Sequence, residues 1–441
     1  MGEGKEKTKI GLVTAICIIV ANMIGVGVYT SIHYQAMGIQ SSFAILALWI
    51  VGGLIALSGA LTYGELAVHM PRSGGEYNYL SRIYHPAIGF LSGWVSSTVG
   101  FSAPLAAMAM AFGFYFGHIV GIEPQVLAFG LVALLTLINI SSFRLGSSFH
   151  TVFTIMNVLL ILLISIAGYV WGDHSHYSFT MGKNDFDAIF QDNFAVSLVF
   201  VSFAYSGWNS ATYVAGEIKD PARLLPKALF IGTLIVLLLY VLLNFIFLYT
   251  VPIPELAKNE HVAFVSAVNI FGHDGAKIIS IVISIGLIAS VNSIMIAGPR
   301  VTQVIGQDFP FFSTFARENK SGTPVYATVL QSLIAVILIA TSSFQGIITY
   351  IGFTLSLFTT LTVTGVFVYR SKHPLEPGTY RTWGYPITPL VLIGLELWMM
   401  YYLCKNNTEE SLYGFATILS GLIVYYLISN KNKTTETREN N

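Results

Sequence analysis

Charged side chains are scarce in this chain. Only 10% of the 441 residues are charged, whereas 54% are hydrophobic and the mean hydropathy is +0.69. A soluble domain is about a quarter charged. So few ionisable groups cannot solvate a surface of this size, and the composition therefore predicts that lipid covers much of it. The formal net charge of zero argues against nucleic acid as a partner.

Cysteine and the motifs of enzyme chemistry are also scarce. The two cysteines, Cys17 and Cys404, lie in separate apolar segments and cannot form a disulfide framework. The sequence has no nucleotide-binding loop, no zinc spacing and no nucleophile–base motif, so we expect no cofactor, no metal and no enzymatic activity. His174 and His176 could bind a metal weakly, but a solvated loop is the favoured interpretation.

Long hydrophobic runs, by contrast, are abundant. A helix needs about 20 apolar residues to cross a bilayer, and neither an open sheet nor short alternating barrel strands fit these runs. The first run, which follows Lys9, lacks a cleavage site and is expected to be a retained span. The sequence thus predicts an all-α integral membrane protein with 12 transmembrane helices, at residues 10–36, 41–68, 86–117, 125–142, 148–171, 193–216, 227–251, 276–304, 323–343, 345–369, 386–404 and 411–429.

The basic residues predict the orientation. With the N-terminus in the cytoplasm, 18 of the 22 Lys and Arg residues fall on the inner side, as the positive-inside rule requires. The outer segments hold only Lys183, Lys258, Lys277 and Lys405. We therefore expect a multi-pass protein of the cell (plasma) membrane with both termini in the cytoplasm.

The spans divide into two comparable halves. Residues 10–171 and 193–369 each hold five spans, joined by an outer loop at 172–192. Residues 370–429 hold the last two spans. The cytoplasmic ends are residues 1–9 and a polar tail, 430–441, that is expected to be disordered.

Glycine-rich interruptions occur midway through the first span of each half. They are Asn22-Met-Ile-Gly-Val-Gly-Val28 and Phe203-Ala-Tyr-Ser-Gly-Trp-Asn209. Plain close packing at the glycines is the alternative, but paired broken helices in corresponding positions indicate an inverted-repeat transporter site. Unwinding frees N–H groups that can bind a carboxylate and carbonyls that can accept from an ammonium group. A zwitterionic amino acid satisfies both.

Several motifs at these breaks and beyond them give the chain a family resemblance. It resembles the amino acid–polyamine–organocation superfamily, most closely its L-type amino acid transporter branch. The similar segments are Ile24-Gly-Val-Gly-Val-Tyr29, Tyr63-Gly-Glu-Leu-Ala67, Pro71-Arg-Ser-Gly-Gly-Glu-Tyr77, Phe203–Asn209, Glu217-Ile-Lys-Asp-Pro221 with Leu225-Pro226, and Gly298-Pro-Arg300 with Asp308 and Thr323-Pro324.

The resemblance implies a fold and a substrate site. The fold would be a 5+5 inverted repeat, like that of the sodium-coupled leucine transporter, with helices 1 and 6 unwound. The substrate would bind along two stretches, Ile24, Gly25, Val26 and Gly27, and Phe203, Ala204, Tyr205 and Ser206. Its carboxylate would meet N–H groups of Val26 and Gly27, and its amino group the carbonyls near Ile24, Phe203, Ala204 and Ser206. Phe203 would be an aromatic gate; its alternative is a lipid-facing or packing side chain.

Two positions depart from the family pattern. Val26 replaces the serine of the first break, which removes a hydroxyl but keeps the backbone donors. Asn157 stands where many relatives carry a coupling lysine, and a neutral amide cannot carry a proton. Exchange or facilitated transport is therefore favoured over proton coupling through a lysine. Sodium coupling stays open, because Asn157, Ser290 and Ser293 offer oxygen ligands; Asn157 could equally be a hydrogen bond between helices.

Ionisable residues inside spans need a reason. We expect Glu65 to have a structural partner such as Arg72 or a loop backbone, and Glu396 to support packing or a dimer surface. Neither break contains a charged residue, which favours small neutral amino acids as substrates. A sodium- or proton-coupled symporter and an amino acid sensor without transport remain alternatives.

The loop at 118–124 lacks the cysteine with which heteromeric relatives bind a glycoprotein. No disulfide-linked ancillary glycoprotein is expected as a partner, and the chain would act as a monomer or homodimer.

Overall fold

A computed structural model describes residues 9–141, 147–173, 183–374 and 378–439. Within these residues the regular structure is helical, and the only strand-type pairing is two isolated bridges. The helices of the first half are α1 (Leu12–Met23), α2 (Val26–Gly38), α3 (Ser42–His69), α4 (Glu76–Ile83), α5 (Pro86–Val95), α6 (Ser102–Val120), α7 (Pro124–Ile140), α8 (Ser147–Trp171) and α9 (Lys183–Ile189).

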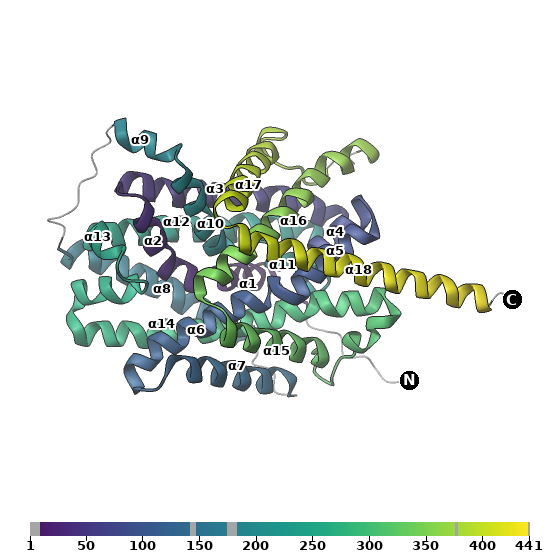
Figure 1. The fold of residues 1–441 in the computed structure, drawn as a ribbon, viewed down its shortest axis with the longest axis horizontal. Coiled ribbons are helices and arrows are strands. Elements are labelled where there is room, and N and C mark those ends of the chain that lie inside the picture. Colours follow the sequence, from purple (N-terminus) through teal and green to yellow (C-terminus); the bar gives the residue numbers. More distant parts are fainter. Residues whose placement is uncertain (1–8, 142–146, 174–182, 375–377, 440–441) are drawn as a thin grey trace.

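The remaining helices follow in the same bundle. They are α10 (Asp192–Tyr205), α11 (Ser210–Tyr213), α12 (Pro221–Thr250), α13 (Ile253–Leu256), α14 (Val262–Asp308), α15 (Val325–Thr341), α16 (Phe344–Lys372), α17 (Ile387–Asn406) and α18 (Thr408–Glu439). Most of the long helices run along one axis of the bundle, with α9 and α13 at one end and the end of α18 at the other (Figure 1).

Nine helical segments of the described chain are long and apolar enough to cross a membrane. Three shorter apolar helices, α7, α10 and α15, occupy the positions expected for the fourth, sixth and ninth spans. The helix α10 is short because it stops at the expected interruption. Many Leu, Ile and Val side chains on α7, α8, α17 and α18 are exposed, which suits contact with lipid tails.

The two ends of the bundle differ in charge. Arg72, Arg223, Arg300 and Arg370 lie at the ends or connections of α3, α12, α14 and α16, and we call this the basic end. The opposite end carries α13 and the first part of α14, which is interrupted at Gly272 with φ +71°. Residues 252–275, which follow α12, are thus largely helical at this end.

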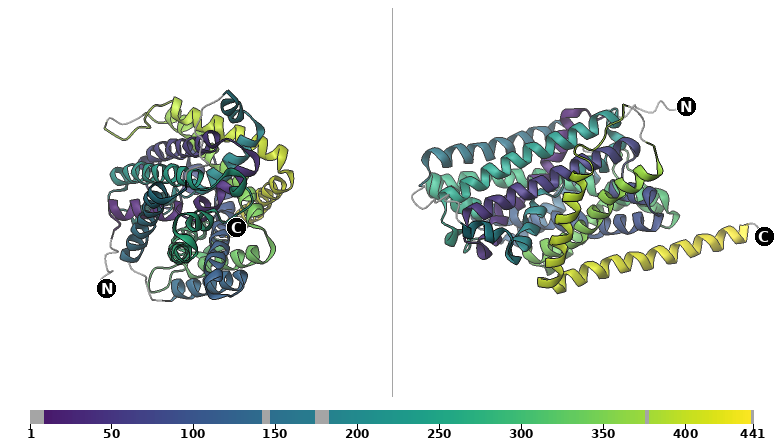
Figure 2. Two further views of the ribbon diagram at one scale, coloured as in Figure 1. Left: turned by 90° about the vertical axis from the view of Figure 1, so that its left-hand side faces the viewer. Right: turned by 90° about the horizontal axis from the view of Figure 1, so that it is seen from above.

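The last helix is longer than expected. The helix α18 runs to Glu439 and extends beyond the rest of the bundle (Figure 2), so the prediction of a disordered tail from residue 430 is wrong as far as Glu439. Continuing an existing helix avoids the nucleation cost that a separate polar segment would face.

The two expected partners of the buried Glu65 carboxylate can be compared with the structure. Glu65, on α3, receives two hydrogen bonds of 2.7 Å from Arg370 on α16, and Thr382 donates to it from both its backbone and its hydroxyl. A loop backbone partner is therefore confirmed, whereas Arg72 as the partner is wrong. Arg72 instead pairs with Asp308 at 2.6 Å.

Candidate functional site

The first interruption lies between α1 and α2. The helix α1 ends at Met23, where the N–H of Ile24 donates to the carbonyl of Val20. Gly25 is extended, and α2 begins at Val26 without a side-chain cap. The first N–H groups of a helix have no partner within it, so those of Val26, Gly27 and Val28 are donors at the break.

The second interruption lies between α10 and α11. The helix α10 ends at Tyr205, and Gly207 has φ +95°, a conformation that a side chain would strain. A Cβ at Gly207 would lie 2.8 Å from the carbonyl oxygen of Asn22, and one at Gly27 would lie 2.6 Å from Cα of Ala204. The two breaks are therefore in direct contact, and the glycines permit that contact.

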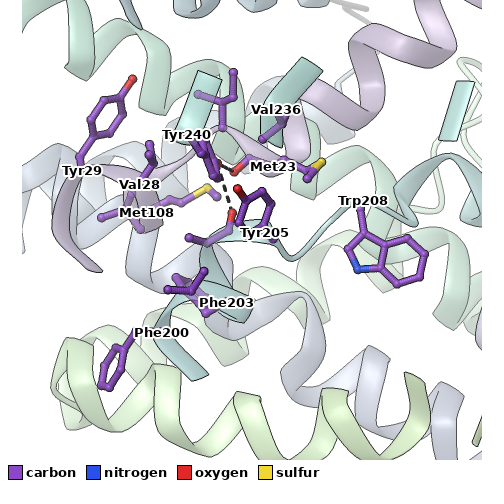
Figure 3. Close-up of a cluster of buried hydrophobic side chains, with 14 of the residues drawn as sticks. Met23, Val28, Tyr29, Met108, Phe200, Phe203, Tyr205, Trp208, Val236 and Tyr240 are labelled. Atoms are coloured by element: carbon purple, nitrogen blue, oxygen red, sulfur yellow. Dashed lines mark hydrogen bonds between the residues drawn. The ribbon is translucent and has the colours of Figure 1, made fainter. Parts of the chain in front are cut away.

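Hydroxyl groups bind the carbonyls that the breaks release. Tyr240, on α12, donates to Met23 at 2.5 Å and to Ala204 at 3.1 Å, and its ring lies between the two breaks (Figure 3). Ser290, on α14, donates to the carbonyl of Ile24 at 2.7 Å. Each of these carbonyls keeps a second lone pair, with which it can accept from a substrate ammonium group.

A cavity of about 110 Å³ adjoins the breaks. Its lining includes Phe203 and Ser206 among the expected residues, together with Asn22, Gly207 and Asn209. The π-helical turn Ser96–Gly100 between α5 and α6 contributes a further wall. Such turns occur frequently at functional sites, and this one widens the space beside the second break.

The other expected residues lie around the cavity and not on its wall. Gly25 and Gly27 are held against Met108 and Ala204. Tyr205 turns away toward α3, where its hydroxyl donates to the carbonyl of Trp49 at 2.9 Å.

A second cavity, of about 440 Å³, faces the end opposite to the basic end. It is lined by Val26, Tyr34, Phe114, Glu260 and Phe344, among others. Phe203 lines the first cavity, Phe344 lines the second, and their rings meet edge to face with centroids 6.5 Å apart. The aromatic pair thus stands between the two cavities.

Two carboxyl groups line the first cavity, which the sequence did not lead us to expect. Glu76 accepts at Oε1 from Tyr63 at 2.5 Å, Thr359 at 3.3 Å and Asn209 at 3.4 Å. Glu396 is only 5% exposed, and its Oε2 has no hydrogen-bond partner. Glu396 therefore packs inside the bundle beside the cavity and not on an exposed dimer surface, and the cavity next to the breaks has acidic groups although neither break contains one. The sequence feature that pointed to an acidic group in the interior was the position of Glu396 within an apolar span.

Asn157 lies in the contact between α8 and α14. It is buried, and a Cβ at Gly286 would overlap its Oδ1. Gly286 is one turn from Ser290, which binds the carbonyl of Ile24. The position is therefore linked to the first break through α14, while nearby Asn22 donates to Ser293 at 2.8 Å.

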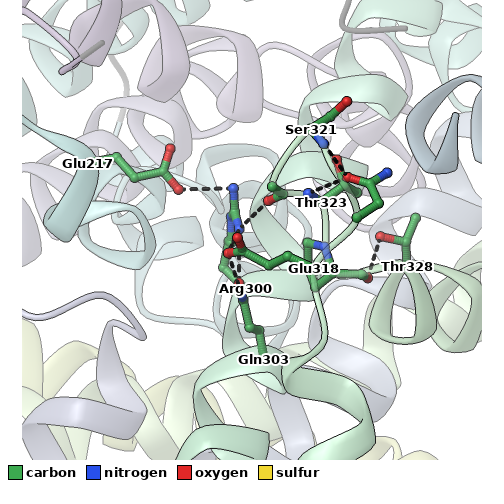
Figure 4. Close-up of polar contacts among 10 residues, drawn as sticks. Glu217, Arg300, Gln303, Glu318, Ser321, Thr323 and Thr328 are labelled. Carbon is green, nitrogen blue, oxygen red and sulfur yellow. Dashed lines mark hydrogen bonds and ion pairs between the residues drawn. The ribbon is translucent and has the colours of Figure 1, made fainter. Parts of the chain in front are cut away.

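Ion pairs connect the elements at the basic end. Arg300, on α14, contacts Glu217 at 3.0 Å and Glu318 at 3.5 Å, and it also donates to Gln303 (Figure 4). Glu217 follows α11, so the pair fixes the segment after the second break to α14. Its backbone carbonyl also accepts from Ile10, just before α1. These contacts join the segment after the second break to α14 and to the chain just before α1.

Comparison with known proteins identifies the family of the chain. The family described as "Amino acid permease" matches residues 10–427. The chain belongs to the amino acid permease family. It is a multi-pass membrane protein of the amino acid–polyamine–organocation superfamily and its L-type branch; this family comprises transporters and not enzymes.

Three relatives of this permease cover most of its length. "Large neutral amino acids transporter small subunit 2" of Oryctolagus cuniculus is 32% identical over 96% of this chain and 80% of its own. "Serine/threonine exchanger SteT" of Bacillus subtilis (strain 168) is 28% identical over 95% of this chain and 96% of its own. "b(0,+)-type amino acid transporter 1" of Mus musculus is 28% identical over 95% and 87%.

Proposed function

We propose that this permease carries small neutral L-amino acids across the plasma membrane by alternating access. The observation that carries the proposal is the uncapped start of α2 at Val26, packed against the broken end of α10. Backbone donors and the positive end of a helix dipole suit a carboxylate, and the adjacent carbonyls suit an ammonium group. This site holds the α-amino and α-carboxyl groups and leaves the side chain to the cavity.

Each expected residue has a role in this proposal. Val26 and Gly27 bind the carboxylate through their N–H groups, while the carbonyls of Ile24, Ala204 and Ser206 accept from the amino group. Phe203 is the gate, and its contact with Phe344 between the two cavities supports that role. Gly25 and Tyr205 shape the site, the first by its extended backbone and the second by fixing the end of α10 to Trp49.

The architecture we propose is twelve transmembrane helices in a 5+5 inverted repeat, divided as the sequence suggests. Both termini would be cytoplasmic, so that the basic end faces the cytoplasm. In this proposal the ion pair of Arg300 and Glu217, at 3.0 Å, helps to close that end, so opening the end breaks the pair. Spans 1, 2, 6 and 7 would move against spans 3, 4, 8 and 9 and expose the site alternately on the two sides.

We propose that the permease works as a monomer or homodimer without a disulfide-linked partner. The name of the rabbit relative, a "small subunit", indicates that this relative assembles with another chain. In the present chain Cys17 is buried, and the loop at 118–124 has no cysteine. Electrophoresis of the membrane-embedded chain with and without reductant tests this, and a reductant-sensitive larger species would overturn it.

Exchange or facilitated transport is the mode we propose, because Asn157 offers no ionisable group. The experiment is uptake of labelled alanine, serine and leucine into liposomes that hold the purified permease. Uptake that requires unlabelled amino acid inside and ignores sodium and pH gradients establishes exchange; uptake into empty liposomes without a gradient establishes facilitated transport. Binding without any uptake, from folded protein, would overturn transport in favour of a sensor.

Cation-coupled symport is a second candidate, and Glu76 and Glu396 favour it. Burial raises the pKa of the Glu76 carboxyl to about 7, while hydrogen bonds from Tyr63, Thr359 and Asn209 oppose that rise. Among the described residues that line this cavity there is no Lys or Arg, so a proton or another cation is needed to neutralise the two carboxyl groups.

The same liposome uptake assay distinguishes exchange from proton-coupled symport. Proton coupling through this pair predicts uptake that accelerates when the outside pH falls from 8 to 6, and that becomes independent of pH in Glu396→Gln. Exchange predicts no effect of a pH gradient in the wild-type protein. Ser202→Ala, which removes from the same cavity a hydroxyl that contacts Met399 Sδ, is the matched control for a general change of cavity polarity.

A further inference from the structure

A groove at the basic end plays no part in the proposed transport site. It has a volume of about 620 Å³ and lies between α3, α12 and the segment 378–383 that precedes α17. Its apolar surface comes from Leu61 of α3, Phe230 of α12, and Trp383. The ring centroids of Phe230 and Trp383 lie 5.3 Å apart, and Trp383 is 60% exposed.

Two cations stand at the mouth of this groove. Arg223 and Lys227 lie one turn apart at the start of α12, and both are exposed. Among the residues that the structure describes, the side chains of Arg223 and Lys227 make no hydrogen bond or ion pair, and the wall of the groove has no Asp or Glu. Like charges four residues apart repel on a helix, so this pair attracts an anion.

The wall facing α12 is firmly held. Tyr380 donates to the carbonyl of Leu61 at 3.3 Å, and Thr382 is bound to the buried carboxylate of Glu65. Glu65 is held in turn by Arg370. The segment that presents Trp383 is therefore fixed to α3, and the groove exists before any ligand binds.

The depth of the groove matches the edge of a bilayer. Leu61 lies eight residues before the end of α3 and Phe230 nine residues after the start of α12, which places them about 12–13 Å inside the basic ends of these helices. Arg223 and Lys227 lie nearer the ends, at the level of lipid headgroups. Tryptophan is enriched at the same interface.

We propose that this groove binds an anionic phospholipid of the adjacent leaflet. The phosphate lies between Arg223 and Lys227, and one acyl chain follows Leu61, Phe230 and Trp383 into the hydrocarbon. A free phosphate would use the two cations but leave the apolar wall without a ligand. The inference rests on the chain being a multi-pass membrane protein and is independent of its transported solute.

The test is native mass spectrometry of the full, detergent-purified permease titrated with phosphatidylglycerol and, separately, with phosphatidylcholine of the same acyl chains. We expect preferential binding of phosphatidylglycerol. Each cation near a membrane surface contributes about 1 kcal/mol to attraction of anionic lipid, so Arg223→Gln with Lys227→Gln should weaken that binding about 30-fold. Lys227→Gln alone should weaken it about 5-fold.

The matched control is Arg317→Gln with Lys320→Gln, which removes the same charge from exposed residues at the same end but outside the groove. It should leave phosphatidylglycerol binding unchanged. Trp383→Ala should weaken binding of both lipids a few-fold. Melting temperatures of all variants verify that they are folded, and the single Lys227→Gln variant carries the test if the double variant is not.

Three outcomes would overturn the proposal. One is equal binding of the two lipids by the wild-type protein, and another is an equal loss in the control pair. The third is displacement of phosphatidylglycerol by millimolar inorganic phosphate with no effect of Trp383→Ala, which would indicate a free-anion site. Because binding alone is measured, failure here leaves the transport proposal intact, and absence of transport leaves this proposal intact.

Discussion

Substitution of Gly27 by alanine tests whether the contact of the two breaks forms the substrate site. A Cβ at residue 27 would lie 2.6 Å from Cα and 2.8 Å from Cβ of Ala204. Both atoms belong to the chain near the end of α10, so no flexible side chain can move aside. The start of α2 must separate from α10, and the N–H groups at Val26 and Gly27 move with it.

The size of the effect follows from the overlap. Inserting a methyl group into a packed interior typically costs about 1–3 kcal/mol. If that strain is relieved by moving the donors off the carboxylate, substrate affinity falls roughly 5- to 150-fold. At Gly25 the nearest atom is instead the terminal methyl of Met108, 2.2 Å away. A change of that side chain's rotamer costs about 0.5–1.5 kcal/mol, so Gly25→Ala should be the milder substitution.

The assay is the half-saturating concentration for alanine uptake in liposomes, together with the melting temperature of each protein. Gly130→Ala is the matched control, because nothing lies within 4 Å of a Cβ at that position. Gly27→Ala should raise the half-saturating concentration at least 5-fold, and Gly130→Ala should leave it unchanged. Equal, wild-type values for Gly27→Ala and Gly130→Ala in folded protein would refute the placement of the substrate at this contact.

Three further predictions concern Phe203, the ion pair of Arg300 with Glu217, and the hydrogen bonds of Tyr240. Phe203→Ala should lower uptake at least tenfold with a smaller change in thermal stability, and unchanged uptake would argue against a gate. Arg300→Gln should increase cytoplasmic alkylation of a cysteine placed at Ser210 several-fold, in a background without native cysteines; equal labelling would show that the ion pair with Glu217 does not control opening. Tyr240→Phe leaves two buried carbonyls without their donor and should destabilise the protein by about 1–3 kcal/mol, measured by denaturation, whereas an unchanged stability would contradict the hydrogen bonds described.

The breaks could be predicted from sequence because their cause is local. Glycines in the middle of an apolar run remove side chains where two backbones meet, and Gly27 and Gly207 are needed for that reason. The sequence does not show that the Glu396 side chain points toward the cavity. Its helix has polar residues on several faces, so the pattern does not reveal which face turns inward. The partner of Glu65 was equally hidden, because Arg370 lies 305 residues away and several arginines were available.

The hydroxyl of Tyr240 has a mechanical consequence. It is hydrogen-bonded both to the last turn of α1 and to the last turn of α10. If one of these helix ends tilts alone, Tyr240 must give up the hydrogen bond to one of them. Through α12, a displacement of one break would therefore be coupled to the position of the other.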